Sequence, residues 1–477
     1  MNNINNPKKI LIIGGVAAGT SAASKARRID PHADIKIIQD ESVVSYGACG
    51  IPYVIEGLID NFDKLIARSA DEFKNKYNID ILSNTLATKI DPVKNQVIAK
   101  DLKSKNEMVF KYDSLIITTG ARAYIPKIKG LDPNNKNNIK NVFFLRNFED
   151  GINIQNNLKK VKSSIIIGSG LIGIEMVESF KKRGIDTTLV ERGDHLLARI
   201  LDKDMSKMIE EELVRNKINI ILNENIEEII LSSGNDQVIR TNAIGIRTNN
   251  RKIYADCILL GLGVKPNSEL ARNAGIETGY RDAIKTDEYM RTNMQNIFAA
   301  GDCAIAKNYV TDKDDYLPLG TTANKQGKIA GENAASLKNK IKFNGIAGSA
   351  ITKTFDLFAG KVGLNKQGAV ENGFDPIENK IEDITRASYY PNNKKIWIKL
   401  VADRKTKLIL GAQIVGGEGV KGRIDLISLA LLKKSTIDDL INYESCYVPP
   451  TSPVWDPLNI AAIQILKLCN KEVSKKK

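Results

Sequence analysis

Cys49 is the residue of this sequence best suited to redox chemistry, because it stands among glycines and tyrosines in the segment 45–53, SYGACGIPY. A lone thiolate can attack a disulfide sulfur or be oxidised to a sulfenic acid, and without a resolving cysteine the second sulfur must come from another molecule. The five cysteines show neither paired nor metal-like spacing, so we expect no structural disulfide and no metal site. The others stand in apolar or strand-like contexts and are predicted to serve packing: Cys257, Cys303, Cys446 and Cys469.

A glycine-rich loop at residues 168–173 has the spacing that binds a dinucleotide. It follows the apolar strand 164–167 and opens a helix that ends near Gly184, so that backbone amides can approach a pyrophosphate. Glu191 follows at the distance where a carboxylate binds the adenosine ribose, which favours NADH, although Arg192 keeps NADPH open. The predicted contacts with this nucleotide are Gly168, Gly170, Leu171, Ile172, Gly173, Glu191 and Gly263.

A similar unit stands at the beginning of the chain. The strand 9–13 leads into a loop with three glycines, and a helix of small residues follows to about Arg28. The acidic position is here Gln39, which can still bond a ribose, or Asp40 takes over. The strand 296–300 ends in Gly301-Asp302, whose carboxylate can accept hydrogen bonds from a polyol such as the ribityl chain of FAD. The predicted FAD contacts are Gly14, Gly15, Ala17, Ala18, Gly19, Gln39, Asp40, Thr119, Gly120, Gly301, Asp302 and Ala323.

Two such units predict an α/β protein with two Rossmann-like dinucleotide-binding domains. No glycine loop opens a further nucleotide site after about residue 346, and strand-like runs at 395–400 and 408–415 with an apolar helix at 424–432 predict an α+β end domain. An Asn-rich stretch at 134–141 is predicted to be a surface linker. The expected boundaries are 1–149 and 281–345 for two segments of the FAD-binding domain, 150–280 for the NAD(P)H-binding domain, 346–470 for a dimerisation domain and 471–477 for a basic tail.

Composition excludes several classes of protein. Hydrophobic residues make up 42% and charged residues 26%, as in soluble globular proteins, and no apolar run is long enough for a membrane helix. The net charge of +14 suits an acidic small molecule, but no basic run is interleaved with aromatic residues, so we expect no nucleic-acid surface. The cysteine pattern fits a reducing cytoplasm.

Together these segments resemble the flavin-dependent pyridine nucleotide–disulfide oxidoreductases. The single-cysteine branch is most similar, namely coenzyme A-disulfide reductase and its relatives, the NADH oxidases and polysulfide reductases. Besides the Cys49 segment, the second glycine loop and Gly301-Asp302, the resemblance rests on 118–120 (TTG), 319–327 (LGTTANKQG) and 447–456 (YVPPTSPVWD), so it covers nearly the whole chain. It implies bound FAD, NADH or NADPH as reductant, and a homodimer.

Departures from the family pattern narrow the subclass. Members with two active-site cysteines carry the second one five positions after the first, where this chain has Val54, and the two histidines, His32 and His195, lie outside the end domain that supplies their acid/base dyad. An internal dithiol mechanism is therefore excluded. Ala17 replaces the histidine of NADH peroxidases and water-forming oxidases, and Leu171 replaces an aromatic residue that often gates the nicotinamide.

The resemblance also implies roles for residues outside the glycine loops. Tyr447, and a tyrosine of the pair Tyr389-Tyr390, match aromatic residues that reach from the partner subunit toward the flavin and the cysteine; a phenol there can donate a proton to a departing thiolate. Four residues match positions that bind the nucleotide part of coenzyme A, although a solvated helix end explains the basic ones equally well: Ser21, Lys25, Arg28 and Ser45.

The expected function is reduction of coenzyme A disulfide, or a related disulfide, by NAD(P)H through FAD and Cys49. An NADH oxidase that passes electrons to oxygen, or a polysulfide or persulfide reductase, is the enzymatic alternative. A flavoprotein that only carries electrons to a partner would not need Cys49, and the presence of that cysteine speaks against this third hypothesis.

Overall fold

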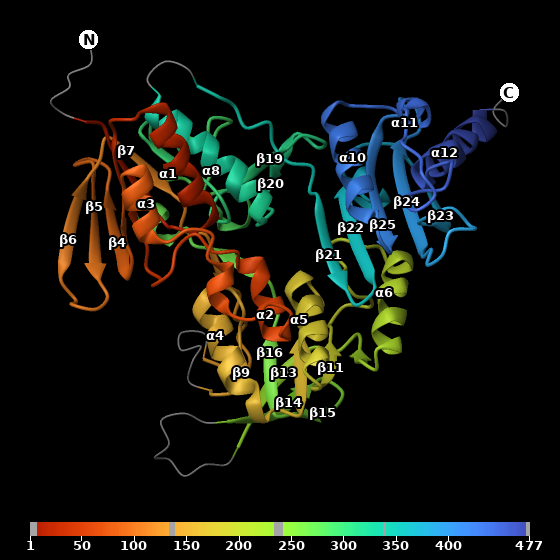
Figure 1. Cartoon of the computed structure of the whole chain (residues 1–477), viewed down its shortest axis with the longest axis horizontal. Helices are drawn as coiled ribbons and strands as arrows, with labels where there is room; N and C mark the ends of the chain where they lie inside the picture. Colours follow the sequence, from red (N-terminus) through yellow and green to blue (C-terminus); the bar gives the residue numbers. More distant parts are fainter. Residues whose placement is uncertain (1–6, 133–138, 233–241, 337–339, 474–477) are drawn as a thin grey trace.

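Two parallel sheets of five strands each form the cores of the first two lobes in the computed structural model, which describes residues 7–132, 139–232, 242–336 and 340–473 (Figure 1). A third sheet, also of five strands but antiparallel, forms the C-terminal lobe. The predicted α/β class, with two Rossmann-like units and an α+β end domain, is confirmed.

The first sheet is assembled from two parts of the chain that are far apart in sequence. Its strand order is β18-β7-β1-β2-β3, with all neighbours parallel. The strands are β18 (Ile297–Ala299), β7 (Ser114–Ile117), β1 (Lys9–Ile13), β2 (Asp34–Ile38) and β3 (Ile79–Leu82). Because the strands are parallel, the residues after β18, β7 and β1 meet at one edge of the sheet.

Helices α1 (Ala17–Ile29) and α8 (Gly320–Ala335) cross in close contact beside this sheet. A Cβ atom on Gly327 would lie 2.2 Å from the carbonyl oxygen of Ala18, and one on Gly331 would lie 2.1 Å from that of Ala22. Only glycine fits between backbones at such distances. The two helices run in the same direction, so their first turns lie at the same end.

The second sheet is formed by one continuous part of the chain. Its order is β12-β11-β10-β16-β9, again with all neighbours parallel. The strands are β12 (Asn219–Ile221), β11 (Asp186–Val190), β10 (Ser163–Ile167), β16 (Cys257–Leu260) and β9 (Val142–Phe143). Helix α5 (Leu171–Lys182) follows the second glycine loop, and α6 (Lys203–Arg215) precedes β12.

The C-terminal sheet has the order β21-β22-β25-β24-β23. The strands are β21 (Ala350–Thr354), β22 (Leu357–Gly363), β25 (Ile409–Gly416), β24 (Lys395–Asp403) and β23 (Pro376–Ile384). Its helices are α9 (Lys366–Glu371), α10 (Val420–Leu432), α11 (Ile437–Asn442) and α12 (Pro457–Val473). The two predicted strands and the predicted apolar helix of this region are β24, β25 and α10.

Shorter elements complete the lobes. The first lobe adds the helical segments η1 (Ala48–Gly50), α2 (Ile51–Glu56), η2 (Phe62–Leu65), α3 (Ala70–Tyr77), α7 (Glu269–Asn273) and η4 (Tyr280–Asp282). Its smaller strands are β4 (Thr85–Asp91), β5 (Gln96–Asp101), β6 (Glu107–Lys111), β19 (Ala306–Asn308) and β20 (Lys313–Asp315). The second lobe adds α4 (Phe148–Asn157), η3 (Leu158–Lys160), β13 (Ile226–Leu231), β14 (Ala243–Thr248) and β15 (Lys252–Tyr254).

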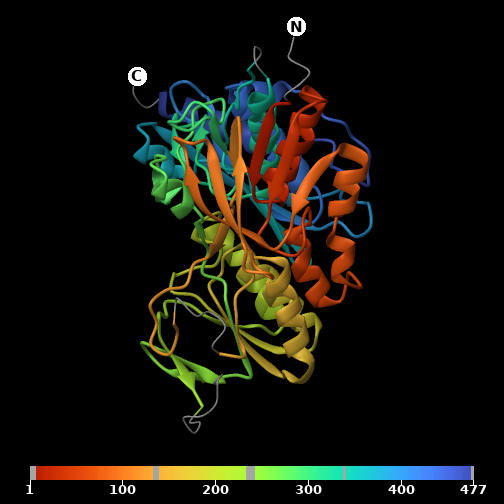
Figure 2. The same ribbon diagram turned by 90° about the vertical axis from the view of Figure 1, so that its left-hand side faces the viewer.

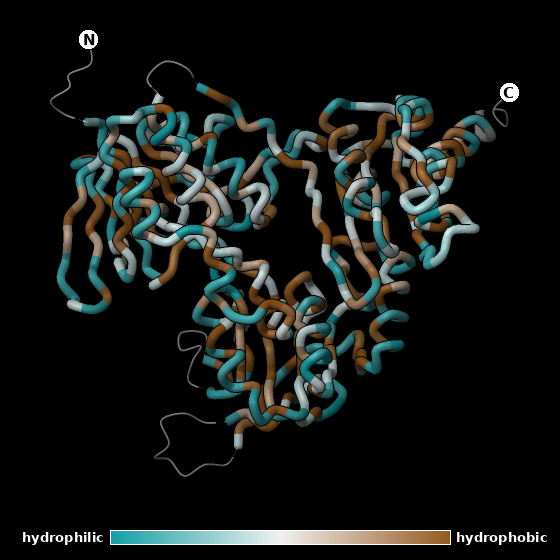
Figure 3. Tube along the Cα trace, viewed as in Figure 1, coloured by the Kyte–Doolittle hydropathy of each residue, from teal (hydrophilic) through white to brown (hydrophobic). Residues whose placement is uncertain are grey.

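A two-stranded ribbon joins the first two lobes. Strands β8 (Ala121–Ala123) and β17 (Val264–Pro266) pair antiparallel, so the chain leaves and re-enters the first lobe at one place. Figure 2 shows the second lobe, coloured from amber to green, below the other two. Strands of the two parallel sheets are hydrophobic along much of their length (Figure 3), as buried parallel strands require.

One of the four cysteines predicted to serve packing lies on the surface. The packing role predicted for Cys446 is wrong: Cys257, Cys303 and Cys469 are buried, but Cys446 is exposed in the connection between α11 and α12. The apolar neighbours that suggested packing belong to a surface loop. Most of the Asn-rich stretch predicted as a linker lies outside the described residues.

A buried ion pair fixes the segment between α11 and α12. Arg423 on α10 donates to both carboxylate oxygens of Asp456, with Nε–Oδ1 at 3.1 Å and Nη2–Oδ2 at 2.7 Å. Asp456 also accepts from Ser452 Oγ and from the Leu458 amide. Because both charges are buried, Asp456→Asn should lower the free energy of unfolding of this lobe by about 3–5 kcal/mol. Urea titration followed by fluorescence of the two tryptophans, both in this lobe, measures the loss.

The control for this variant lies on the same helix. Asp425 pairs with Lys421 in solvent, so Asp425→Asn should change the free energy of unfolding by no more than about 0.5 kcal/mol. Equal losses in the two variants would contradict the assignment of this stability to the buried pair.

Candidate active site

Cys49 lies at the start of helix α2, in the short η1 turn, and its side chain is exposed. The segment before it is pinned to the backbone of residues 65–67: Gly47 donates to the Leu65 carbonyl at 2.9 Å, and the Ala67 amide donates to the Ser45 carbonyl at 2.8 Å. Val54, five positions later, is fully buried. Cys49 is therefore an exposed residue on a backbone that these hydrogen bonds hold in place.

Three charged groups from separate elements act on this thiol. Burial of part of its surroundings raises the pKa of Cys49, and the charge of Glu175 on α5 raises it further, while Arg146 opposes both and Asp302 adds a smaller upward contribution. The thiol form is thus favoured in the protein alone, and a positive charge near the sulfur promotes the reactive thiolate.

Arg146 and Asp302 form the polar centre of the first lobe's strand edge. Arg146 Nη2 donates to Asp302 Oδ2 at 2.6 Å, and its Nε donates to the Ala121 carbonyl at 2.8 Å. The Tyr316 hydroxyl donates to the Asp302 carbonyl at 2.8 Å. A Cβ atom on Gly120 would lie 3.8 Å from Arg146 Nη2, so the guanidinium borders this predicted FAD position as well.

The separately predicted FAD contacts meet at this edge. A Cβ atom on Gly301 would lie 2.8 Å from the Ala18 Cβ and 3.5 Å from the Ala323 Cβ, so three distant segments converge there. Neither α1 nor α8 has a side-chain N-cap or an acidic residue in its first turn, whereas α3 and α4 have both. The first backbone amides of these two helices therefore remain free to donate hydrogen bonds to a ligand. Amides in such positions can bind a pyrophosphate and the polar edge of a ring, so the residues present fit FAD.

The first glycine loop has the close geometry of a dinucleotide turn. Gly14 has φ +105°, and a Cβ atom there would lie 2.1 Å from the Thr118 carbonyl oxygen. Gln39, at the expected acidic position, is buried and accepts the Gly15 amide at 2.5 Å, whereas Asp40 is exposed. The Gln39 amide group remains as a donor for a ribose. Thr119, which follows Thr118 in the sequence, donates to the Asn267 carbonyl at 2.6 Å.

The second glycine loop is organised around Glu191. Its Oε2 accepts from the amide and the hydroxyl of Ser169, both at 2.8 Å, and its Oε1 accepts the Gly193 amide at 2.8 Å. A carboxylate has about four acceptor positions, so one remains for a ribose hydroxyl. Helix α5 starts at Leu171 without a side-chain cap, and Gly263 takes φ +92° in the loop after β16. These residues fit a dinucleotide.

The two tyrosines implied by the resemblance lie together on the C-terminal lobe. The hydroxyl groups of Tyr389 and Tyr447 are 2.9 Å apart, and both side chains are exposed, by 73% and 41% respectively. Neither tyrosine is among the groups that shift the pKa of Cys49 within one chain. Their exposure suits the expected contact with a partner subunit.

The predicted substrate-binding residues differ in whether their side chains already have partners within the protein. Lys25 pairs with Glu332 of α8 at 2.7 Å, and Ser21 Oγ donates to Asn324 at 2.6 Å. Arg28 donates only to the Ser24 carbonyl, at 3.1 Å, and meets no carboxylate in the part of the chain that the structure describes. Ser45 has φ +50°. Of the two basic side chains, Arg28 is thus the one whose charge remains available.

Sequence reasoning missed Arg146 and Glu175, the two charged residues that shift the pKa of Cys49 most. Neither stands in a glycine loop or beside a cysteine. Glu175 lies two positions after the last glycine of the second loop, on the first turns of α5, and that spacing was the available signal. Arg146 has no local signal, because its partner Asp302 follows 156 residues later.

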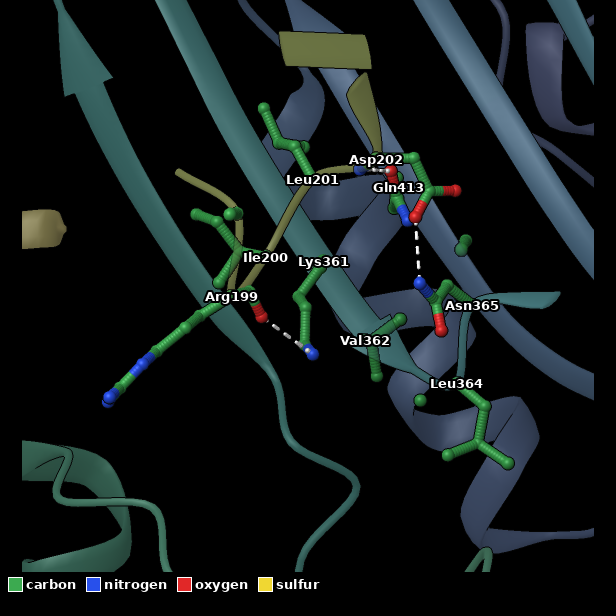
Figure 4. A pocket seen from close by; sticks show the side chains of 12 residues that line it. Arg199, Ile200, Leu201, Asp202, Lys361, Val362, Leu364, Asn365 and Gln413 are labelled. Carbon is green, nitrogen blue, oxygen red and sulfur yellow. Dashed lines mark hydrogen bonds between the residues drawn. The ribbon is translucent and has the colours of Figure 1, made fainter. Parts of the chain in front are cut away.

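A cavity of about 230 Å³ lies elsewhere, between the second and C-terminal lobes (Figure 4). The Asp202 amide donates to Gln413 Oε1 at 2.8 Å, and Asn365 Nδ2 donates to the Asp202 carboxylate at 2.7 Å. Lys361 Nζ donates to the Arg199 carbonyl at 3.1 Å. Its polar groups join the two lobes, and none of the predicted site residues lines it.

Within residues 7–132, 139–232, 242–336 and 340–473, no three His, Cys, Asp or Glu side chains gather as metal ligands would. The helices there are all too short or too polar to cross a membrane.

Comparison with known proteins identifies the same architecture. The sequence profile described as "Pyridine nucleotide-disulphide oxidoreductase" matches residues 8–327, and the one described as its "dimerisation domain" matches residues 349–457. The chain is 38% identical to a protein of Methanocaldococcus jannaschii named NADH oxidase, over 97% of this chain and 100% of that protein. It is 37% identical to the NAD(P)H sulfur oxidoreductase (CoA-dependent) of Pyrococcus abyssi, over 96% of this chain and 98% of that protein.

More distant relatives extend the range of names. The coenzyme A disulfide reductase of Staphylococcus aureus is 29% identical over 95% of this chain and 98% of that protein. Among solved structures, an NAD-dependent persulfide reductase from A. fulgidus superimposes with a TM-score of 0.90 at 35% identity, over 97% of this chain and 84% of the other.

Proposed function

The chain belongs to the pyridine nucleotide-disulphide oxidoreductase family, and from that premise we propose that it reduces coenzyme A disulfide, or a closely related sulfur–sulfur substrate, at Cys49. It is an FAD-dependent enzyme that takes its electrons from NADH or NADPH. The single observation that carries the proposal is the exposed Cys49 thiol among Glu175, Arg146 and Asp302, with a buried Val54 where a resolving cysteine would stand.

The chain's own residues have defined tasks in this proposal. The Cys49 thiolate attacks one sulfur of the disulfide; the sulfur–sulfur bond breaks, a mixed disulfide forms, and the first coenzyme A leaves as a thiolate that takes up a proton. Bound FAD would supply the two electrons, drawn from the nicotinamide nucleotide, that break the sulfur–sulfur bond of the mixed disulfide and so release the second coenzyme A and restore the Cys49 thiolate. Tyr447 of the partner subunit donates a proton to a departing thiolate, and Arg28 binds a phosphate of the substrate.

A mass spectrum of the untreated protein tests the substrate. A mass increase of one coenzyme A on Cys49, lost on treatment with a thiol reductant, supports the disulfide reductase. A single added oxygen on Cys49 instead supports the oxidase, the second candidate function, which the name of the M. jannaschii relative favours. Added sulfur atoms would support a polysulfide or persulfide reductase, as the P. abyssi and A. fulgidus names favour.

Glu191 sets the preference between the two reductants. Glu191→Ala should weaken NADH binding by about 1.5–3 kcal/mol, because a hydrogen bond to a charged group is lost. Discrimination against NADPH should relax in the same variant. The Michaelis constants for both nucleotides measure the change. Glu191→Gln, which keeps an acceptor for the loop amides, is the matched control, and an unchanged NADH constant in the alanine variant would remove Glu191 from the site.

Two wider expectations belong to this proposal. The five cysteines are free thiols, which suits a reducing cytoplasm. The dimerisation profile at 349–457 supports a homodimer. The proposed domains are 1–149 and 281–345 for FAD, 150–280 for NAD(P)H and 346–470 for dimerisation.

A further inference from the structure

Helix α5 and its C-cap residue form hydrogen bonds with the segment that follows Cys49. Ser179 Oγ donates to the carbonyl of Pro52 at 2.9 Å, and Arg183 Nε donates to the carbonyl of Ile55. Both carbonyls belong to α2, which begins two residues after Cys49. The position of α5 therefore determines where this segment lies.

The opposite side of α5 is held by the C-terminal lobe. Thr352 on β21 donates its hydroxyl to Glu175 Oε1 at 3.1 Å, and Thr352 is only 4% exposed. One turn further along, Glu178 accepts from Lys353 Nζ at 3.2 Å and from the Phe355 amide at 2.7 Å. Glu178 has two donors, one of them charged, whereas Thr352 is the one side chain described as donating to Glu175.

Among charged side chains, Glu175 has the largest effect on the pKa of Cys49, which its negative charge raises. Burial raises the pKa of Glu175 to about 7, and the Thr352 hydrogen bond opposes that rise by stabilising the carboxylate. Near neutral pH the charge on Glu175 is therefore variable. Arg146 and Asp302 complete the charges on the thiol, and other titratable or charged groups face this region: Tyr53, Glu56, Glu178, Lys182 and Lys353.

We propose that Thr352, a residue of the dimerisation domain, is a positioning residue for the redox thiol: its hydroxyl orients the Glu175 carboxylate and thereby sets the balance between thiol and thiolate at Cys49. The proposal rests on the proposed function in taking Cys49 as the reacting sulfur. The link from the dimerisation domain to the chemistry has two parts: a hydrogen bond from Thr352 on β21 to Glu175 on α5, and the through-space effect of the Glu175 charge on the Cys49 thiol.

The test measures the rate at which iodoacetamide alkylates Cys49 in the FAD-loaded enzyme as a function of pH. Mass spectrometry of the Cys49 peptide separates it from the other exposed cysteine, Cys446. Thr352→Val keeps the shape and removes the donor, so Glu175 loses its negative charge at a higher pH than before. Less negative charge then faces the sulfur, and at pH 7.5 alkylation of Cys49 should become roughly two- to threefold faster.

Two further variants distinguish this path from a change in packing. Thr352→Ser restores the donor and should return the pH profile to that of the parent enzyme. In a Glu175→Gln background, where no charge is left to orient, Thr352→Val should have no further effect. Superimposable profiles of the valine variant and the parent, or an equal effect of Thr352→Val in the glutamine background, would overturn the proposal. Disulfide turnover by Cys49→Ser tests the proposed function separately, because alkylation requires no substrate.

Discussion

Replacing Cys49 with serine should abolish disulfide reduction while FAD stays bound and is still bleached by NADH under anaerobic conditions. Serine cannot form the mixed disulfide, so turnover with coenzyme A disulfide or polysulfide should fall by about 10⁴-fold or more, to background. The glycine loops, Arg146 and Asp302 are untouched by the change. Slow production of hydrogen peroxide from oxygen should survive, since it requires only reduced flavin. Stopped-flow spectra and turnover assays with the three acceptors measure all three outcomes.

The matched control is Cys446→Ser, which removes the other exposed thiol. It should retain disulfide turnover, because Cys446 lies in the C-terminal lobe and has no role in the proposed reaction. Full disulfide turnover by Cys49→Ser would refute the mechanism. Loss of oxygen reduction alone would favour the oxidase instead.

Gly14→Ala should yield a protein that cannot retain FAD. Gly14 has φ +105°, which strains any side chain, and its new Cβ would lie 2.1 Å from the Thr118 carbonyl oxygen. That oxygen belongs to the backbone after β7 and cannot rotate away. The loop must therefore open, and the amides at the start of α1 lose their alignment. The ratio of flavin to protein after gel filtration should fall by more than about tenfold, a free-energy change of at least ~1.4 kcal/mol.

Gly184→Ala is the control that separates the effect of backbone strain from the effect of the steric clash with Thr118. Gly184 has φ +77°, and a Cβ there meets nothing within 4 Å, so this variant carries the strain alone and should keep its flavin. A full complement of flavin in Gly14→Ala would show that the close approach to Thr118 is not needed for binding.

The elements with local signals were predictable from the sequence. Apolar runs before the two glycine loops are β1 and β10, and the glycine spacing places α1 and α5 directly after them. The carboxylate of Glu191 lies on its own glycine loop, as the distance in sequence indicates. In each case the residues that interact lie within one supersecondary unit, so their spacing carries the information.

The charges around Cys49 could not be read in the same way. Glu175 stands in an amphipathic helix, where a glutamate is typical of a solvated face, but its side chain accepts a hydrogen bond from Thr352 of β21, 177 residues later. Tyr389 and Tyr447 were chosen through resemblance, and their hydroxyl contact joins loops 58 residues apart. Periodicity describes which face of an element is buried, but it does not say what covers that face.

The split of the first sheet has a consequence for synthesis of the chain. Every strand of the second sheet lies between residues 142 and 260, so that lobe can close as soon as this part has left the ribosome. The first sheet lacks its edge strand β18 and the helix α8 until residue 335 has been made, although β1 is translated before the other strands of that sheet. The N-terminal lobe must therefore wait, with its hydrophobic edge open, while a later lobe folds beside it. Cofactor capture by the nascent protein is consequently a late event, and β7, whose edge stays unpaired until β18 has been made, is the strand that most needs protection from wrong pairing in the meantime.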